Sequence, residues 1–483
     1  MADEFAPRRR ALDDWRASLR EERAESRTRE DGWVAVWAGF VLVLMLLYLM
    51  IGQSPYTHEV TLDPLTGAAA TSPVNRTIWL ALLALSLPIV WLRRGEIVDQ
   101  AKRLWPLLLL FVWFGATTRW AIDPSASNKR FILYVINLLV CMALAAGLRD
   151  PRRMHAALAS ACAIIILIDL FSWIVLPEKS MTVLGVAAIH NHKNTLGAVM
   201  LLCALIIIPY AIFLRSLAAR IAWGALFVGC LILLVVSKSK TSLALVIALM
   251  ALIPVLLICL RLRTGALLAL VAIGGLALLA AAFGWLAWCY TSGVDPLSPL
   301  HDVTFTQRTD VWTFALGEFA QRPLKGVGFA SFWDVDPMIQ PSLQTGAWFA
   351  QPDSYTNEAH NGYIDILVTT GALGLAGALI LLARWMLGGL AFLRRGLLDL
   401  SGASHDLLPH ALFLATFPLM FFVHNWMESS YFTANAMFGI LMLLVGVDID
   451  MQRPAAADAR PAPRRRRPTP SVSPLLPPSG WRS

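Results

Sequence analysis

Charged residues are scarce in this chain. Asp, Glu, Lys and Arg make up only 15% of its 483 residues, whereas hydrophobic residues make up 57%. The mean hydropathy of +0.62 lies above the range of soluble globular domains. The few charges are concentrated at the two ends and in short breaks between apolar runs long enough to cross a bilayer. This composition excludes an ordinary soluble fold and predicts an all-α polytopic membrane protein.

Three further absences narrow the class of protein. Residues 1–31 contain no short apolar core followed by a small-residue cleavage site, so we expect no cleaved signal peptide. The net charge of +8 comes without a folded basic domain, which argues against a nucleic-acid partner and favours basic tails beside anionic lipid. Paired cysteine spacing is also absent, which excludes a zinc or redox motif. The six cysteines all lie inside apolar runs: Cys141, Cys162, Cys203, Cys230, Cys259 and Cys289.

Twelve apolar runs predict about twelve transmembrane helices, with one large loop over residues 291–361 between the ninth and the tenth. The third run is short and could instead be re-entrant or strongly tilted. We expect a cytoplasmic tail over residues 1–31, a transmembrane domain over residues 32–449 and a disordered basic, Pro-rich cytoplasmic tail over residues 450–483. The expected spans are 32–52, 77–92, 105–118, 131–148, 155–176, 196–214, 221–236, 241–260, 265–290, 362–383, 407–423 and 431–447.

The arginines and lysines orient these spans. Twelve spans place both termini on one side of the membrane, and 29 of the 40 Lys and Arg residues fall on that side, against 11 on the other. Because short cytoplasmic loops carry an excess of Lys and Arg, both termini are expected in the cytoplasm. The protein is then a multi-pass inner-membrane protein whose large loop faces the periplasm.

This topology collects four polar clusters on the outer side: residues 190–194, residues 237–240, the large loop, and residues 424–428. Cations at outer helix ends run against the charge bias, so we expect them to hold an anion, with a phosphate-bearing ligand as the natural candidate. The loop is too apolar for a simple linker. Its aromatic residues predict amphipathic segments on the membrane surface that wall a groove. They are Trp312, Phe314, Phe319, Phe329, Phe332 and Trp333.

His360 and Asn361 stand at the end of this loop, and Gly371 and Gly374 follow after a gap of nine residues. The resulting pattern, H-[NSQ]-x9-G-x-x-G, resembles the signature of the bacterial O-antigen ligase and Wzy-type polysaccharide polymerase superfamily. The members of this superfamily are membrane glycosyltransferases of the C-type class.

Three other stretches, 192–197, 308–312 with its continuation 323–332, and 425–429, resemble the same superfamily and point to its exopolysaccharide-polymerase branch. The likeness covers roughly residues 183–447. One stretch departs from the family pattern, because Ser237-Lys238-Ser239-Lys240 stands where Ser-x-Ser-Arg is common. A lysine there offers a point charge in place of a bidentate fork.

The resemblance implies transfer of a glycan from undecaprenyl diphosphate to an acceptor hydroxyl, with inversion at the anomeric carbon and without a metal or other cofactor. A diphosphate leaving group needs a cation, which suits Arg308. The acceptor hydroxyl needs a base with a pKa near neutral, which suits His360. These two are the expected catalytic residues. The expected residues for binding diphosphate or substrate are Lys193, Lys240, Lys238, His192, Asn361 and Glu428.

The leading functional hypothesis is a polymerase that joins lipid-linked repeat units into exopolysaccharide or O-antigen. Its expected partners are the glycan donor, a glycan acceptor, membrane lipid and a chain-length regulator protein. A ligase that transfers finished glycan to lipid A core or to a protein would use the same chemistry. A polysaccharide transporter or flippase is a lesser alternative, because the polar residues gather on one face and the two halves show no repeat.

Other polar residues admit simpler roles. His190 and His192 form at most a weak metal pair without a third ligand, and a structural role is favoured. Asp169 lies in the middle of the fifth span, where an ionisable group is costly, and is either functional or neutral and hydrogen-bonded. Glu428 could orient a histidine, bind acceptor or cap the last helix.

Overall fold

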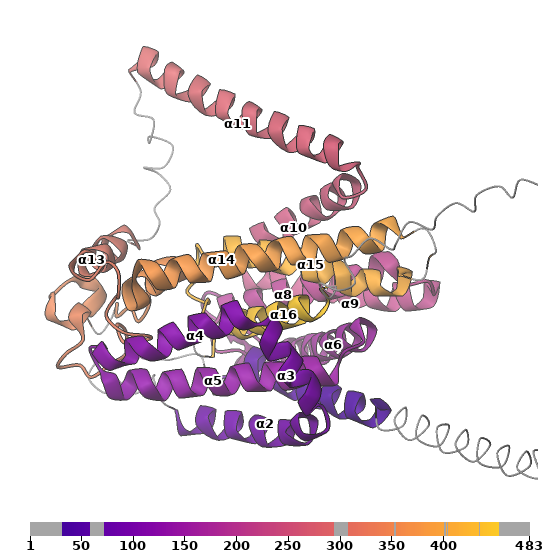
Figure 1. The fold of residues 1–483 in the computed structure, drawn as a ribbon, viewed down its shortest axis with the longest axis horizontal. Coiled ribbons are helices and arrows are strands. Elements are labelled where there is room, and N and C mark those ends of the chain that lie inside the picture. The colour runs from indigo at the N-terminus through magenta and orange to yellow at the C-terminus, as the bar shows by residue number, and fades with distance from the viewer. Residues whose placement is uncertain are drawn as a thin grey trace, which may run out of the picture.

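A computed structural model describes residues 31–57, 72–293, 308–351, 354–399, 402, 404–433 and 435–453. These residues form a bundle of long, roughly aligned helices (Figure 1). Within these ranges, strands occur only in one short antiparallel hairpin, which pairs β1 (Met181–Thr182) with β2 (Gly185–Val186). The predicted all-α class is therefore confirmed for the described part of the chain.

The helix bounds follow the apolar runs. The first helix covers Asp31–Ile51. It is followed by α2 (Pro73–Leu92), α3 (Arg94–Arg103), α4 (Trp105–Thr117), η2 (Thr118–Trp120), α5 (Pro124–Gly147), α6 (Pro151–Val175) and α7 (Pro177–Ser180). After the hairpin come α8 (Lys193–Phe213), α9 (Leu217–Ser237), α10 (Lys240–Cys259), α11 (Thr264–Ser292), α13 (Arg308–Gln321), η3 (Pro341–Gln344), η4 (Trp348–Ala350), α14 (Gly362–Leu398), η5 (His405–Leu407), α15 (Leu408–His424) and α16 (Met437–Met451).

Among the described residues, nine helices are long and apolar enough to cross a membrane. The chain is therefore a multi-pass membrane protein. The other three expected spans also correspond to helices, but α4 has 13 residues and α16 has 15. At 1.5 Å per residue these two fall short of a hydrocarbon core of about 30 Å. The ninth span corresponds to α11, which stands apart from the other helices (Figure 1). The count of twelve stays a prediction.

Burial separates central helices from peripheral ones. In α15 and α8, 78% and 72% of the most apolar stretch is buried by other parts of the protein, whereas in α9 the share is 17%. Because lipid covers whatever the protein leaves exposed, α8 and α15 form the interior of the bundle and α9 lies on its surface. Residues at the ends of α8 and α15 are therefore held by several neighbouring helices.

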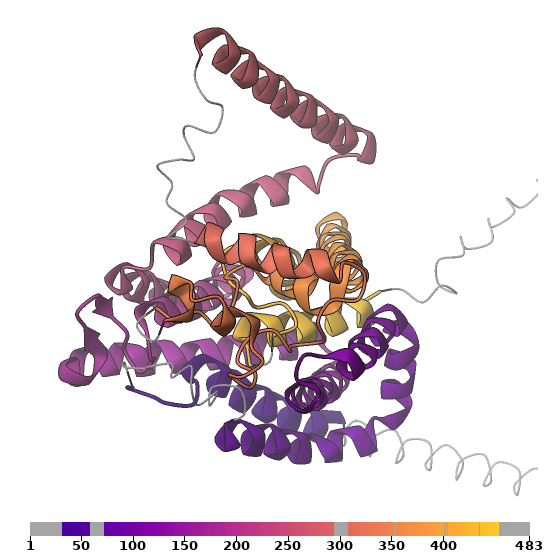
Figure 2. The same ribbon diagram turned by 90° about the vertical axis from the view of Figure 1, so that its left-hand side faces the viewer.

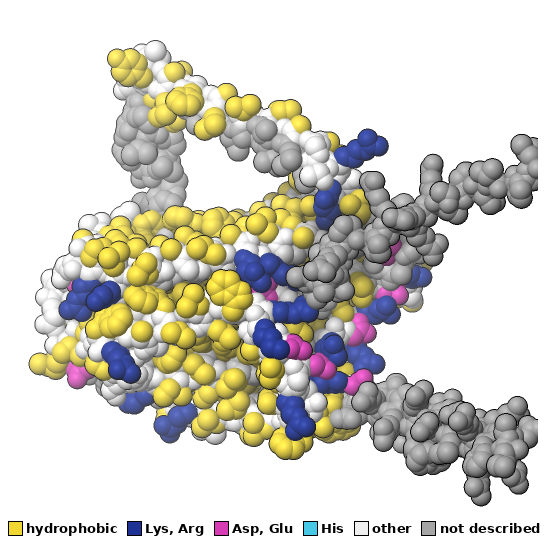
Figure 3. Space-filling model, in the orientation of Figure 1, with side chains coloured by type: hydrophobic (Ala, Val, Ile, Leu, Met, Phe, Trp, Pro, Cys, Tyr) yellow, Lys and Arg dark blue, Asp and Glu magenta, His cyan; other side chains and the backbone are white. Residues whose placement is uncertain are grey.

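The first and last described residues, Asp31 and Arg453, lie at the same end of the bundle, called here the terminal end, because they contact residues at the two ends of the short helix α3. Arg93 forms an ion pair with Asp31 at 2.5 Å, and Arg103 donates to the carbonyl oxygen of Arg453 at 2.8 Å. Lys and Arg side chains gather at this end, while hydrophobic side chains cover the flank of the bundle (Figure 3). The structure thus places both ends of the described chain at one end of the bundle.

The opposite end, called here the loop end, carries α13 and the segment from residue 322 to residue 361. Figure 2 shows α13 and this segment lying across the ends of the helices. The aromatic residues expected on a membrane surface instead form a second small core, because Phe332 and Trp333 are buried and pack with Phe314 and Phe349. The expectation of surface-lying amphipathic aromatics is wrong for Phe329, Phe332 and Trp333. The loop core buries Phe332 and Trp333, whereas Phe329 is buried against Phe114 and Tyr134 of the bundle.

Gly371 explains how the loop is fastened to the bundle. Its φ of +72° interrupts α14, and an added Cβ would lie 2.2 Å from the carbonyl oxygen of Leu324. The interruption frees two carbonyl groups, so that Val327 N–H donates to Val368 and Gly328 N–H donates to Thr369, at 2.9 and 2.8 Å. A residue with a side chain fits neither this backbone conformation nor this close approach. The first glycine of the motif therefore joins the loop to α14.

Candidate active site

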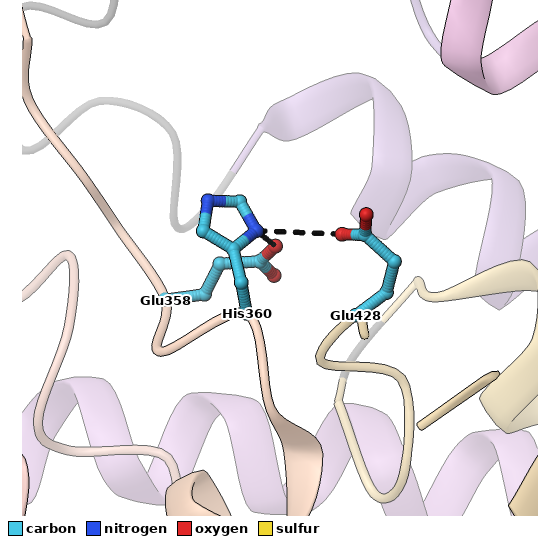
Figure 4. A group of neighbouring side chains, drawn as sticks. All are labelled: Glu358, His360 and Glu428. Carbon is cyan, nitrogen blue, oxygen red and sulfur yellow. Dashed lines mark hydrogen bonds and ion pairs between the residues drawn. The ribbon is translucent and has the colours of Figure 1, made fainter. Parts of the chain in front are cut away.

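His360 lies between two carboxylates at the loop end. Its Nδ1 is 2.7 Å from Oε1 of Glu358 and 3.3 Å from Oε2 of Glu428. Glu358 comes from the same segment, and Glu428 comes from the turn after α15 (Figure 4). Nε2 lies on the far side of the ring from both carboxylates (Figure 4) and has no hydrogen-bond partner among the described residues. The side chain is 35% exposed. One ring nitrogen is thus held by the protein while the other is left for a ligand.

The start of α14 fixes the backbone of His360. Asn361 caps the helix, and its Oδ1 accepts hydrogen bonds from the N–H groups of Tyr363 and Ile364 at 3.1 and 3.3 Å. His360 itself has a φ of +48°, which is uncommon for a residue with a side chain. Such a conformation persists only where the surroundings hold it.

Asp365 fixes the segment around His360 through hydrogen bonds, although the sequence reasoning did not select it. It accepts hydrogen bonds from Trp333 Nε1 at 2.8 Å, from the N–H of Ala359 at 3.2 Å, and from the hydroxyl of Ser429. One buried carboxylate thus joins the loop core, the residue before His360 and the residue after Glu428. Its position one turn into α14, on the side of His360, was the signal available in the sequence.

Two opposing effects set the pKa of His360. Burial lowers the pKa, but hydrogen bonds and charges from Glu358 and Glu428 outweigh it and raise the pKa to about 9. Burial tends to raise the pKa of Glu428, but His360 and Arg308 hold it below its usual range. The expected pKa near neutral for His360 is therefore corrected upward, because Glu358, which the sequence reasoning did not select, adds a second carboxylate. At neutral pH the resting site holds an imidazolium between two carboxylates.

Arg308 reaches the same carboxylate from the start of α13. Its Nη2 is 3.6 Å from Oε1 of Glu428, and its Nη1 donates to the carbonyl oxygen of Met427 at 2.6 Å. Its side chain is 22% exposed. The structure therefore brings together His360, Arg308 and Glu428, three residues that the sequence selected from segments far apart in the chain.

His192 and Lys193 begin α8 beside this group. His192 caps the helix, with Nδ1 accepting from the N–H of Asn194 at 3.2 Å. Burial and the charge of Lys193 lower the pKa of His192, while the negative charge of Glu428 raises it. The start of α8 is therefore within range of the charge of Glu428.

Lys238 and Lys240 are exposed at the turn between α9 and α10. This turn packs against α8, because an added Cβ at Gly197 would lie 2.4 Å from the Cβ of Ser239. Neither lysine forms an ion pair within the described ranges. Two of the expected outer clusters thus adjoin each other, with their ammonium groups unpaired by protein carboxylates.

Two other predicted polar residues are structural. Asn361 is fully buried, and the cap that it makes accounts for its oxygen. His190 is also buried, with Nε2 3.1 Å from Oδ2 of Asp169 and Nδ1 2.9 Å from the carbonyl oxygen of Met50. Asp169 is therefore hydrogen-bonded inside the bundle, and His190 takes the structural role that the sequence favoured.

A metal is the alternative occupant to test at this site. Glu358, His360 and Glu428 form the group of possible metal ligands among the described residues, with ligand atoms within 4.8 Å of one another. Ligand atoms on a tetrahedral Zn²⁺ would be about 3.3 Å apart, given bonds of about 2.0 Å. The 2.7 Å between Nδ1 of His360 and Oε1 of Glu358 is instead a hydrogen-bond distance. The three side chains are arranged as a charged hydrogen-bonded cluster.

A cavity of about 350 Å³ adjoins Glu358 and Asp365. Its polar lining includes Asp334, which accepts hydrogen bonds from Tyr355 at 3.0 Å and Asn357 at 3.2 Å. Burial raises the pKa of Asp334 despite these hydrogen bonds. Aromatic residues complete the lining: Phe114, Phe329, Phe332, Trp333, Tyr431 and Phe432. Aromatic faces beside carboxylate and amide groups offer both apolar contact and hydrogen bonds to a hydroxyl-rich ligand.

In one comparison with known proteins, part of the chain matches a protein family. Residues 225–379 match the family model described as O-antigen ligase. This range contains Arg308, Glu358, His360 and Gly371, and the match confirms the predicted resemblance to the O-antigen ligase and Wzy-type superfamily. No curated protein matches the chain.

Proposed function

We propose that this multi-pass membrane protein is a glycosyltransferase of the bacterial inner membrane. It joins glycan repeat units carried on undecaprenyl diphosphate into exopolysaccharide or O-antigen at the periplasmic face. The observation that carries the proposal is the meeting of His360, hydrogen-bonded through Nδ1 to Glu358, with Arg308 beside Glu428. A held imidazole and a held guanidinium are the groups that displacement of a diphosphate requires. The O-antigen ligase family match over residues 225–379 supports it.

His360 acts as the general base through Nε2 in its deprotonated form, which is the minor form at neutral pH because its pKa is raised to about 9. The acceptor hydroxyl gives its proton to Nε2 as its oxygen bonds to the anomeric carbon, and the bond from that carbon to the diphosphate oxygen breaks. Undecaprenyl diphosphate leaves with the electron pair, so the anomeric centre inverts. Glu358 and Glu428 stabilise the imidazolium formed on His360, as a carboxylate does in a catalytic triad.

Arg308 stabilises the negative charge that develops on the leaving diphosphate. Its fork donates paired hydrogen bonds to phosphate oxygens, which an ammonium group does not. Lys193, Lys238 and Lys240 form the approach for the diphosphate, since they lie at adjoining helix ends and have no carboxylate partner among the residues that the structure describes. His192 lies next to Lys193 in this approach, and the negative charge of Glu428 raises its pKa.

The aromatic cavity beside Glu358 holds the acceptor end of the glycan. Its 350 Å³ suits a sugar residue, and Asp334 with Asn357 provides acceptors and donors for sugar hydroxyls. Because Glu358 lines this cavity and also contacts His360, a sugar hydroxyl bound there lies next to the base.

The reaction proceeds without a metal in this proposal, since Arg308 and the lysines supply the positive charge. A metal chelator is therefore expected to leave the rate of glycan transfer by the purified protein within twofold of its starting value. Loss of activity with a chelator, restored by one added divalent ion, would assign the Glu358, His360 and Glu428 cluster to metal binding instead.

A ligase is the second candidate, and the description of the matching family as O-antigen ligase favours it. Both enzymes use the same donor and the same base, so the difference lies in the acceptor. Deleting the gene separates them. A polymerase mutant accumulates single repeat units on undecaprenol, whereas a ligase mutant accumulates full-length polymer on undecaprenol.

Complementation of the deletion strain tests the chemistry itself. Wild-type protein is expected to restore polymer, and a His360→Ala variant with normal protein levels is expected to fail. Full-length polymer from the His360→Ala variant would remove the proposed base and favour a transporter. His405→Ala, at the terminal end, is the matched control and is expected to complement.

A further inference from the structure

A second cavity of about 340 Å³ lies at the terminal end of the bundle, away from His360. It opens between the start of α6, the turn from α8 to α9 and the start of α15. Its polar lining residues are Arg152, His155, Tyr210, Arg215, Asp406 and His410. The glycosyl-transfer proposal uses none of them.

Two buried histidines line this cavity with unused hydrogen-bonding capacity. His410 binds Oδ2 of Asp448 through Nε2 at 2.6 Å, and His155 binds the carbonyl oxygen of Ile206 through Nε2 at 3.0 Å. The two rings are 5.7 Å apart, edge to face. Each histidine is 1% exposed, and each Nδ1 is buried without a hydrogen-bond partner among the described residues. Buried polar atoms normally have partners, so these two mark a place where a ligand completes the structure.

Two arginines carry the positive charge of the cavity. Arg152 is exposed, and its guanidinium forms no ion pair within the described ranges. Nε of Arg215 is 3.2 Å from Oδ1 of Asp406, and the side chain is 67% exposed, which leaves its terminal nitrogens available to a second anion. Apolar side chains lie beside them in the lining, among them Phe213, Leu214 and Pro409.

We propose that this cavity is a binding site for a phosphate group. Arg152 and Arg215 hold the phosphate oxygens at the mouth, because guanidinium forks match phosphate geometry. On the inner side, the hydroxyl of Tyr210 donates to a phosphate oxygen. Because Nε2 donates to Ile206 in His155 and to Asp448 in His410, each Nδ1 carries a lone pair and accepts a hydrogen bond from an O–H of a protonated phosphate or of a lipid headgroup. The apolar wall is suited to the first carbons of a phospholipid, and free phosphate fits the same cations. The site is independent of the proposed glycosyl transfer.

Binding to the purified full-length protein tests this site with two probes. Inorganic phosphate is titrated in detergent, and nanodiscs of phosphatidylglycerol are compared with nanodiscs of phosphatidylcholine. Thermal unfolding and native mass spectrometry report occupancy. We expect at least one probe to raise the melting temperature of the wild-type protein. Stabilisation by phosphatidylglycerol alone assigns a lipid headgroup, and stabilisation by inorganic phosphate assigns the free ion.

A pair of double variants makes the test specific. Arg152→Ala with Arg215→Ala is expected to weaken binding by roughly tenfold or more. Arg261→Ala with Arg263→Ala removes two exposed arginines elsewhere in the chain and is expected to leave binding unchanged. Tyr210→Phe, which keeps the ring, checks the inner contact. Failure of both probes to stabilise the wild-type protein, or equal loss of binding in the two double variants, overturns the proposal.

Discussion

His360 owes its raised pKa to carboxylates that come from two different segments. Glu358 precedes it by two residues, and Glu428 follows α15, so only the folded chain places both beside Nδ1. The sequence motif singles out the histidine, and the reversed charge bias at the outer helix ends singles out the cations. The second carboxylate could not be predicted from either, because a Glu two residues before a His faces it only in the backbone conformation found here.

The pH dependence of glycan transfer tests the base role. A base works only when unprotonated, and the pKa of His360 is raised to about 9. We expect kcat/KM to rise with pH through the neutral range and to level off above about pH 9. Glu358→Gln removes one carboxylate, so its rising limb should move to lower pH. Rates that fall as the pH increases toward 9 would show that the imidazolium is the active form, as in a phosphate-binding cation.

At the scale of single elements, hydropathy predicted where most helices lie but not how the ends are joined. The helix α14 begins at residue 362, where the span was expected to begin, and it continues past the expected end of the span at residue 383 to Leu398. Beyond residue 383, two arginines of α14 form contacts with other parts of the chain. Arg384 pairs with Asp450 at 2.9 Å, and Arg394 donates to the carbonyl oxygen of Leu262 at 3.2 Å. Such tertiary contacts leave no periodic signal in the sequence.

The last helix shows the same limit. Its expected start at residue 431 is wrong, and α16 begins at Met437. Asn425 causes the difference, since its Oδ1 accepts hydrogen bonds from the N–H groups of Ser430 and Tyr431 at 3.2 and 2.9 Å. These bonds hold the chain in a turn that places Glu428 beside His360.

The close contact between Gly371 and the loop predicts that adding one methyl group at this position disrupts the attachment of the loop to α14. Gly371→Ala introduces a Cβ into a backbone with a φ of +72° and within 2.2 Å of the carbonyl oxygen of Leu324. We expect it to separate the loop from α14, with loss of glycan transfer and a lower melting temperature in detergent. Gly317→Ala in α13 is the control, since nothing lies within 4 Å of its added Cβ. Equal stability and activity of the two variants would contradict this role of Gly371.

At the scale of the whole molecule, the charge distribution predicts the orientation, and the fold places the two proposed sites at opposite ends of the bundle. His360 and Arg308 lie at the loop end, while the cationic cavity of Arg152 and Arg215 lies at the terminal end. The sequence predicted the first grouping through the motif and the arginine count. It could not predict the second, because His155, His410 and Tyr210 come from three helices and match no motif.

Reporter fusions test the proposed orientation. Alkaline phosphatase, active outside the cytoplasm, is expected to be active when fused within residues 119–130 and inactive when fused at Arg263. Green fluorescent protein is expected to give the reverse. Phosphatase activity at Arg263 together with its absence at residues 119–130 would reverse the topology and place His360 in the cytoplasm.

The most direct test of the central claim is single-turnover transfer by the purified protein, with a labelled repeat unit on undecaprenyl diphosphate as donor and a second unit as acceptor. Wild-type protein and the His405→Ala control are expected to form the joined product and release undecaprenyl diphosphate at equal rates. His360→Ala is expected to bind donor but to react about 10²- to 10⁴-fold more slowly. Transfer by a folded His360→Ala protein at the control rate would contradict the account.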